Sequence, residues 1–265
     1  MAPQEAPCVI APDVRNAESS LPAQVQLKLD AGQVARLEEL ARGVGVTPYS
    51  LVQCAWAYVL HTYTGQQRVC FGSVSSGRPA QLAGADATVG PFINTLPVTL
   101  EVDAGRPLRQ WLREAHHQHL EWQNHGFLQL PDILAQSPFS ARVELFNTTL
   151  VYENYPIDSI KDAQSELRMT SLHSQESTGT GLTLVLMPGD GMTVKLMYQS
   201  GEFSATQSER IARHVVRLLA AMPGLADGLV SSLDDTLDDS AGLAGGPGHL
   251  DDEDLLALLD ELDNI

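Results

Sequence analysis

The side chains best suited to proton transfer gather in one short run, where His116, His117 and His119 stand close to Glu121. Imidazole titrates near neutral pH, so a histidine beside a carboxylate is a candidate general acid or base. The flanking residues predict a helix, and positions four apart share one helical face, which makes His117 and Glu121 an ordinary surface pair worth about 0.3 kcal/mol. The sequence therefore favours a surface pair here over a catalytic dyad. No Ser-His-Asp or metal-ligand spacing is recognisable elsewhere.

A second candidate lies in the loop between two β-rich runs, Val69–Val74 and Phe92–Val98. This loop contains Ser76-Gly77-Arg78-Pro79, then Gly84 and Gly90-Pro91. Glycine frees the backbone and proline stiffens it, so the pattern predicts an ordered loop that positions Arg78. On composition alone, an ordinary surface loop with a solvated arginine is an equally good interpretation.

The elements that must position these residues follow from periodicity and capping signals. Helices are expected to begin after Asp30, Thr47 and Ser204, because each can cap a helix whose apolar residues recur with a period near 3.6. The predicted helices cover residues 31–43, 48–63, 107–124 and 205–221, and the predicted strands cover 25–29, 69–74, 92–98, 145–153, 167–172, 182–187 and 192–199. Because strands and helices alternate, the predicted class is α/β with a mixed sheet. Trp56, Cys54 and Cys70 lie in apolar runs and are expected in the core.

Composition narrows the class of protein. The chain has 265 residues, 43% of them hydrophobic, and a net charge of −17, which argues against nucleic acid or an anionic membrane as a partner. Three cysteines are too few for a disulfide framework, and no apolar stretch approaches the ~20 residues of a membrane span. We expect a cytoplasmic protein that binds no metal.

The two ends of the chain differ from its body. Residues 1–22 are polar and rich in proline and alanine, and are predicted to be a linker. Residues 234–265 hold 11 of the 33 acidic residues and no lysine or arginine. Within them, residues 234–249 read as a flexible linker, and residues 250–265 combine acids with leucines at helical spacing, including Leu255, Leu258, Leu259 and Leu262. This helix is predicted to be a docking motif with an acidic rim; a solubilising tail is the alternative.

Three segments resemble the C-terminal half of the condensation domain of nonribosomal peptide synthetases. They are Ser76–Pro79 followed by Val89–Val98, then Leu145–Pro156, then Gly201–Leu219, and they agree with that family in order and spacing. The resemblance implies a chloramphenicol acetyltransferase-like fold, in which two related α/β lobes enclose a tunnel. It makes residues 23–233 the C-terminal lobe. Carrier proteins would deliver both substrates as phosphopantetheine thioesters, with no cofactor bound by this chain.

The family's signature, His-His-x-x-x-Asp-Gly, belongs to the N-terminal lobe, and its second histidine is the base or positioning group. The run from His116 to Trp122 matches that register with Glu121 for aspartate and Trp122 for glycine, but it follows the Ser-Gly-Arg-Pro loop, whereas the family places its signature before that loop. The resemblance therefore implies that the catalytic histidine lies outside this sequence and that the chain alone is inactive.

The resemblance also implies supporting roles for the loop. Arg78, between Gly77 and Pro79, would pair with the signature aspartate of the other lobe; an arginine that bridges to its own lobe is the alternative. Gly84, Gly90 and Pro91 would belong to the loop that forms the tunnel floor, which leads through Asn94 into a strand.

Two further segments correspond to tunnel features. Asn154 would lie near the tunnel, where its amide could hydrogen-bond substrates, or it would be a buried residue that satisfies backbone groups. Residues 174–183 fall where the family has a latch toward the other lobe.

These expectations define one favoured function and two rivals. The favoured function is amide formation between carrier-bound thioesters, with carrier proteins, a complementary N-terminal lobe and a downstream synthetase subunit as partners. The first rival is an inactive lobe that serves as a docking platform in the assembly line. The second is an autonomous acetyltransferase that uses His117.

Overall fold

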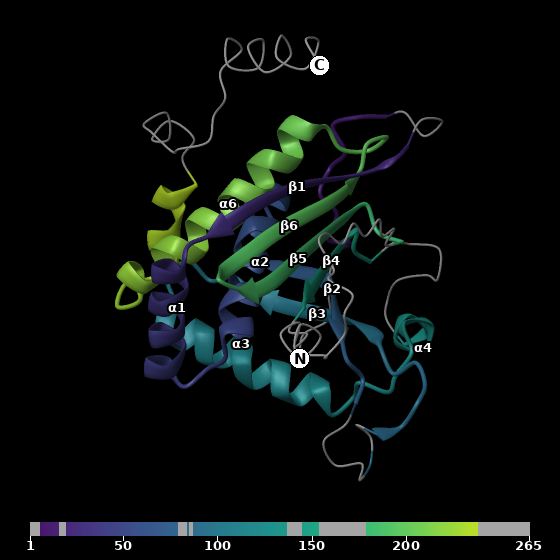
Figure 1. Ribbon diagram of the computed structural model, residues 1–265, viewed down its shortest axis with the longest axis horizontal. Coiled ribbons are helices and arrows are strands. Elements are labelled where there is room, and N and C mark those ends of the chain that lie inside the picture. Colours follow the sequence, from purple (N-terminus) through teal and green to yellow (C-terminus); the bar gives the residue numbers. More distant parts are fainter. Residues whose placement is uncertain are drawn as a thin grey trace, which may run out of the picture.

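A six-stranded mixed sheet with helices on one face forms the body of the protein (Figure 1). The computed structural model describes residues 6–15, 20–78, 84, 87–136, 145–153 and 179–237. Its strands are β1 (Pro22–Leu29), β2 (Arg68–Ser75), β3 (Asn94–Glu101), β4 (Thr148–Tyr152), β5 (Leu182–Gly189) and β6 (Gly191–Gln199). Its helices are α1 (Ala31–Val44), α2 (Pro48–Thr64), α3 (Leu108–Gln123), α4 (Leu130–Ala135), α6 (Ala205–Leu225) and the 3₁₀ helix η3 (Val230–Thr236).

The strand order is β1-β6-β5-β4-β2-β3. The three central strands β5, β4 and β2 run parallel, while β3 and β6 pair with them antiparallel. The carboxyl ends of the parallel strands therefore meet at one edge of the sheet, which is where open α/β sheets place their ligands. The predicted mixed α/β sheet is confirmed.

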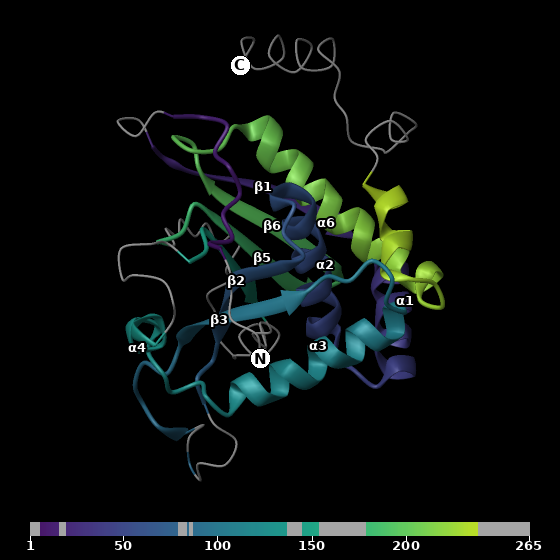
Figure 2. The same ribbon diagram turned by 180° about the vertical axis from the view of Figure 1, so that it is seen from behind.

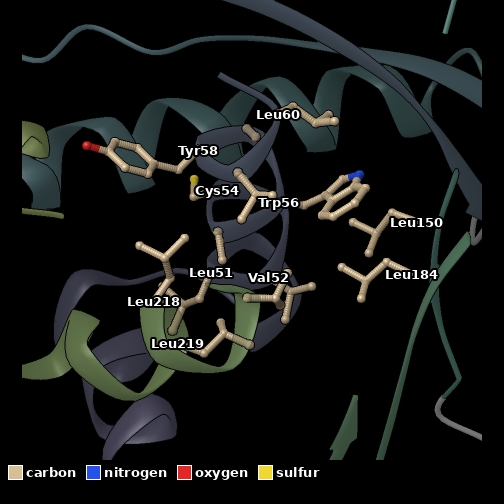
Figure 3. Close-up of a cluster of buried hydrophobic side chains, with 14 of the residues drawn as sticks. Leu51, Val52, Cys54, Trp56, Tyr58, Leu60, Leu150, Leu184, Leu218 and Leu219 are labelled. Carbon is tan, nitrogen blue, oxygen red and sulfur yellow. The ribbon is translucent and has the colours of Figure 1, made fainter. Parts of the chain in front are cut away.

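Helix α2 forms the centre of the core. Every residue from Ser50 to Leu60 is buried, because α2 is packed between the sheet and other helices (Figure 3). Trp56 is fully buried and points toward Leu150 of β4 and Leu184 of β5, and the α6 leucines lie beside Leu51. Seen from behind, α1, α2, α3 and α6 cover the sheet on this face (Figure 2). The predictions that Trp56, Cys54 and Cys70 are buried are confirmed.

The predicted helix starts agree with the capping geometry. Asp30 accepts a hydrogen bond from the backbone N–H of Gln33, whose side chain in turn accepts from the N–H of Asp30, a complete capping box. Thr47 and Ser204 accept in the same way at the starts of α2 and α6. Local sequence thus determines where these helices begin.

The structure differs from the predicted elements at several places. β1 begins at Pro22 and β3 covers Asn94–Glu101, and η3 extends to Thr236, inside the predicted linker at 234–249. Residues 130–135 form α4, which the prolines of that stretch concealed; Pro131 is compatible with a first helical turn, where no N–H is needed. Helix α6 continues to Leu225 with Pro223 inside its last turn. β4 is shorter than predicted and begins at Thr148.

The predicted N-terminal linker is wrong for residues 8–10. Cys8 and Ile10 are fully buried, and the Asn147 side-chain amide holds Ile10 by accepting from its N–H at 3.0 Å and donating to its carbonyl at 2.9 Å. Further along, Asp13 accepts hydrogen bonds from the Ser204 hydroxyl and N–H at the start of α6. Because the anchors are distant in sequence, local periodicity does not reveal this docking.

Some predictions fall outside the described residues. They concern Pro79, Asn154, the strand at 167–172, residues 174–178 of the latch segment, and the tail from residue 238 with Leu255, Leu258, Leu259 and Leu262. In the described part of the chain, no helix is long and apolar enough to cross a membrane.

Candidate functional site

The turn at Ser76-Gly77-Arg78 is packed directly against Phe92. Gly77 has φ +65°, and a Cβ built on it would collide with the carbonyl group of Phe92. Only glycine avoids that collision and adopts this backbone conformation without strain. The two family motifs, about 15 residues apart in sequence, therefore form one unit.

Arg78 is oriented by contacts within the same loop. Its guanidinium carbon lies 4.5 Å from the centre of the Phe92 ring, a cation–π arrangement, and its Nη1 donates to the carbonyl of Thr88 at 3.1 Å. These contacts agree with an arginine that bridges to its own lobe, and they also fix the direction in which the guanidinium points. Pairing with a carboxylate of another lobe stays a prediction.

The rest of the predicted floor loop is closed by short-range hydrogen bonds. The Thr88 hydroxyl donates to the Gly84 carbonyl at 2.8 Å, and Gly90 has φ +155° immediately before Pro91. Asn94 opens β3 and donates to the carbonyls of Gly126 and Leu128, which anchors the turn after α3. Asn94 therefore supports the loop from its own lobe.

His117 and Glu121 lie on the exposed face of α3. Their closest atoms are 3.7 Å apart, and their side chains are 76% and 65% exposed, so they form the predicted surface pair. Neither residue lines the cavity at the edge of the sheet where β2 and β4 end. Solvent reaches most of both side chains, as expected for a surface pair.

A cavity of about 250 Å³ lies at the edge where β2 and β4 end. Its walls include Tyr49, Ser73, Leu96, His119, Trp122 and Tyr152. The Tyr49 hydroxyl lies 2.5 Å from the Ser73 hydroxyl, and the Tyr49 ring makes edge contacts with His119 at 4.9 Å and Tyr152 at 5.6 Å. Ser75 and Ser76 extend the wall up to Gly77, so the cavity adjoins the Arg78 loop.

The imidazole of this cavity belongs to His119, one turn before Trp122 and Gln123 on α3. Its Nδ1 lies 3.5 Å from Gln53 Nε2 and its Nε2 lies 3.0 Å from Gln123 Nε2. Burial, and secondarily the charge of His116, lower the pKa of His119 to about 4. Both contacts are made by amide nitrogens, which only donate, and a neutral ring has one nitrogen without a proton, so that nitrogen accepts from one of the two amides.

Sequence reasoning treated His117 and Glu121 as a surface pair, which the structure confirms, but it missed this cavity and the place of His119 in it. Helical spacing offered a signal: Leu112, Ala115, His119 and Trp122 recur every three or four residues, so His119 lies on the inward face of α3 while His117 points outward. The partners of His119 on α2 are about 66 positions away, and no local pattern reveals them. In the described residues no cluster of His, Cys, Asp and Glu could hold a metal ion.

Comparison with known proteins identifies the family, within the α/β class, to which the chain belongs. Residues 2–241 match the condensation domain family. The chain belongs to this family. This condensation-domain chain is 38% identical over 198 residues to a protein of the linear gramicidin synthase of Brevibacillus parabrevis, and 35% identical over 206 residues to the chondramide synthase cmdD of Chondromyces crocatus.

Both alignments cover most of this chain, 74% and 78%, but only 3% and 5% of the two synthase proteins. Solved condensation domains share the fold. The domain from the monacolin K polyketide synthase MokA superposes with a TM-score of 0.72 at 16% identity, over 87% of this chain and 56% of that structure. The first condensation domain of the CDA synthetase gives 0.59 at 19% identity, over 84% of this chain and 49% of that structure. The predicted chloramphenicol acetyltransferase-like fold is confirmed.

Proposed function

We propose that this chain forms the C-terminal wall of a reaction channel in which two carrier-bound thioesters are joined through an amide bond. The opposite wall is an N-terminal lobe that carries His-His-x-x-x-Asp-Gly. In the reaction, the acceptor amine attacks the donor thioester carbonyl, the new C–N bond forms, and the C–S bond breaks. The amine proton passes to the imidazole of the other lobe, and the imidazolium returns it to the departing phosphopantetheine sulfur, which leaves as the thiol. The residues of this chain shape and orient the channel.

The observation that carries the proposal is the unit formed by Gly77, Arg78 and Phe92. It lies beside the carboxyl end of β2, at the edge of the sheet where ligands of open α/β folds bind. A guanidinium held by a ring and a carbonyl loses little further entropy when it pairs with a carboxylate from the opposite lobe. Arg78 would thereby orient the signature aspartate, and through it the catalytic histidine.

Exposed apolar side chains near this unit support a covering lobe. Val89 is 99% exposed, Ile93 66% and Phe127 74%, and Asn94 connects the β3 start to the turn that bears Phe127. Large apolar side chains with this degree of exposure suit a surface that another protein covers.

The acidic segment at residues 250–265 has a separate role in this proposal. Its leucines and acids would dock the domain onto a downstream synthetase subunit that offers an apolar groove with a basic rim. Removal of residues 250–265 would then abolish binding of that subunit while amide formation by the paired lobes continues at an unchanged rate.

A complementation assay tests the main proposal. A lobe that bears the signature is mixed with this chain and two loaded carrier proteins, and dipeptidyl-thioester is measured by mass spectrometry. Arg78→Ala is compared with Arg213→Ala, which removes an arginine from an exposed pair with Glu209 on α6. Loss of product with Arg78→Ala alone supports the proposal. If the two lobes form no product but still bind carrier proteins normally, with Arg78→Ala as well as with Arg213→Ala, the chain would instead be a docking platform.

A further inference from the structure

The cavity beside the Arg78 loop has a position, a size and a lining that can be compared with those of ligand sites. It lies between the first turn of α2, the last turns of α3 and the ends of β2 and β4, and it is continuous with Ser75 and Ser76 of the motif-bearing loop. Its volume of about 250 Å³ is below the ~300–1,000 Å³ of sites that enclose a whole drug-sized ligand. One amino-acid side chain is a better match in size than a complete aminoacyl-pantetheine.

The walls of the cavity combine aromatic and aliphatic surface with neutral polar groups. Tyr49, Tyr152 and Trp122 supply rings, Leu96 supplies aliphatic surface, and His119 presents an imidazole. Rings at these edge-to-face distances create positions where a further ring packs favourably.

Charge is lacking on this wall. Among the described residues that line the cavity, none is Asp, Glu, Lys or Arg. Burial raises the pKa of Tyr49 to about 12 and lowers that of His119 to about 4, so both are uncharged at neutral pH. A charged side chain placed there would lose its hydration without gaining an ion pair, a large cost.

We propose that this cavity is a side-chain subsite, which receives an uncharged aromatic side chain of one of the two aminoacyl groups and rejects charged ones. The proposal rests on the proposed function, because that function supplies the aminoacyl groups. It adds a selectivity that is determined by this lobe alone.

The intrinsic tryptophans allow a direct binding test on the full chain. The sequence has three, of which Trp56 and Trp111 are buried in the core and Trp122 lines the cavity. Emission is recorded while the amides of phenylalanine, leucine, aspartate and lysine are added up to 20 mM. We expect a saturable change with phenylalanine amide, at least tenfold weaker apparent affinity for aspartate and lysine amides, and loss of the change in Trp122→Phe.

Filling the cavity tests its location. Gln123→Phe places a ring at the exposed rim of the cavity and also removes the Gln123 contact with His119. Leu120→Phe adds the same ring on α3 at a position that is 48% exposed and does not line the cavity. Phenylalanine amide should bind at least fivefold more weakly to Gln123→Phe and normally to Leu120→Phe. Equal responses to all four amides, no response to phenylalanine amide, or equal effects of the two variants would overturn the proposal.

The outcome is independent of catalysis. The binding of amino-acid amides is measured on this chain without the other lobe. If the paired lobes form no product, the proposed function fails, but the binding result still tests the subsite. Conversely, a productive lobe pair that joins charged and aromatic aminoacyl groups at equal rates would reject the subsite while amide formation stands.

Discussion

The backbone of Gly77 lies so close to the carbonyl of Phe92 that no side chain fits between them. This contact joins the residue two positions after β2 to the residue two positions before β3, and it closes the base of the loop that connects the two strands. Arg78 takes its direction from the same residue, through the Phe92 ring.

Gly77→Ala therefore tests the loop unit, and Gly84→Ala is its matched control. Both glycines have positive φ, at +65° and +80°, but the space around Gly84 is open. We expect Gly84→Ala to cost only the conformational strain of about 1–2 kcal/mol, and Gly77→Ala to cost clearly more and to abolish product in the complementation assay. Thermal unfolding and product formation measure the two effects. Equal behaviour of both variants would contradict the contact.

Phe92→Leu separates the orientation of Arg78 from its charge. The variant keeps an apolar side chain and the guanidinium but removes the ring face, so the rate with the complementing lobe should fall by about two- to fivefold, as expected for a cation–π interaction of about 0.5–1 kcal/mol. Arg78→Lys keeps the charge but loses the planar fork, and should be slower still. Rates are measured at saturating lobe concentration. An unchanged rate in Phe92→Leu would show that the ring does not orient Arg78.

Asn147→Ala tests the docking of the N-terminal segment. The substitution leaves the buried N–H and carbonyl of Ile10 without their partner, so we expect a loss of about 2–4 kcal/mol in the free energy of unfolding. Asn124→Ala, at the exposed end of α3, is the control and should change stability by less than about 0.5 kcal/mol. Urea unfolding monitored by circular dichroism gives both values. If the two variants are equally stable, the Asn147 clamp contributes nothing.

His119 makes stability depend on pH. The unfolded chain protonates this imidazole near pH 6.5, whereas the folded chain resists protonation until about pH 4, so the unfolded state binds more protons between these values. Stability should therefore fall as pH decreases from about 6.5 to about 4, by roughly 2 kcal/mol after allowance for the partial exposure of the ring.

His119→Gln removes this contribution and keeps a polar side chain. The difference in free energy of unfolding between the parent chain and the variant should be constant above about pH 6.5. Below that pH the parent chain should lose stability relative to the variant. Urea titrations at five pH values measure this difference. Curves that stay parallel down to pH 4 would show that His119 is protonated as easily in the folded chain as in the unfolded one.

Local signals were sufficient for much of the fold. Asp30, Thr47 and Ser204 are caps within their own segments, and the alternation of Val25, Leu27 and Leu29 with polar residues indicates the inward face of β1. Of the candidate site, only the residues within the loop motifs could be predicted. Gly77 and Arg78 could be selected, but their contact with Phe92 depends on how the loop closes.

Longer-range features could not be predicted. The cavity brings together Tyr49, Ser73, His119 and Tyr152 from four elements, and the N-terminal segment is held by Asn147, 137 positions from Ile10. Such contacts result from the packing of elements against one another, and a single sequence contains no periodic signal for them.

The central claim is that this chain supplies one wall of the reaction channel and that the imidazole comes from the other. The most direct measurement keeps the concentration of a signature-bearing lobe fixed, adds this chain in increasing amounts, and follows the rate of dipeptidyl-thioester formation. The account predicts a rate that rises from background to a plateau, with no product from this chain alone. A rate that is independent of this chain, or product formed by this chain without the other lobe, would contradict it.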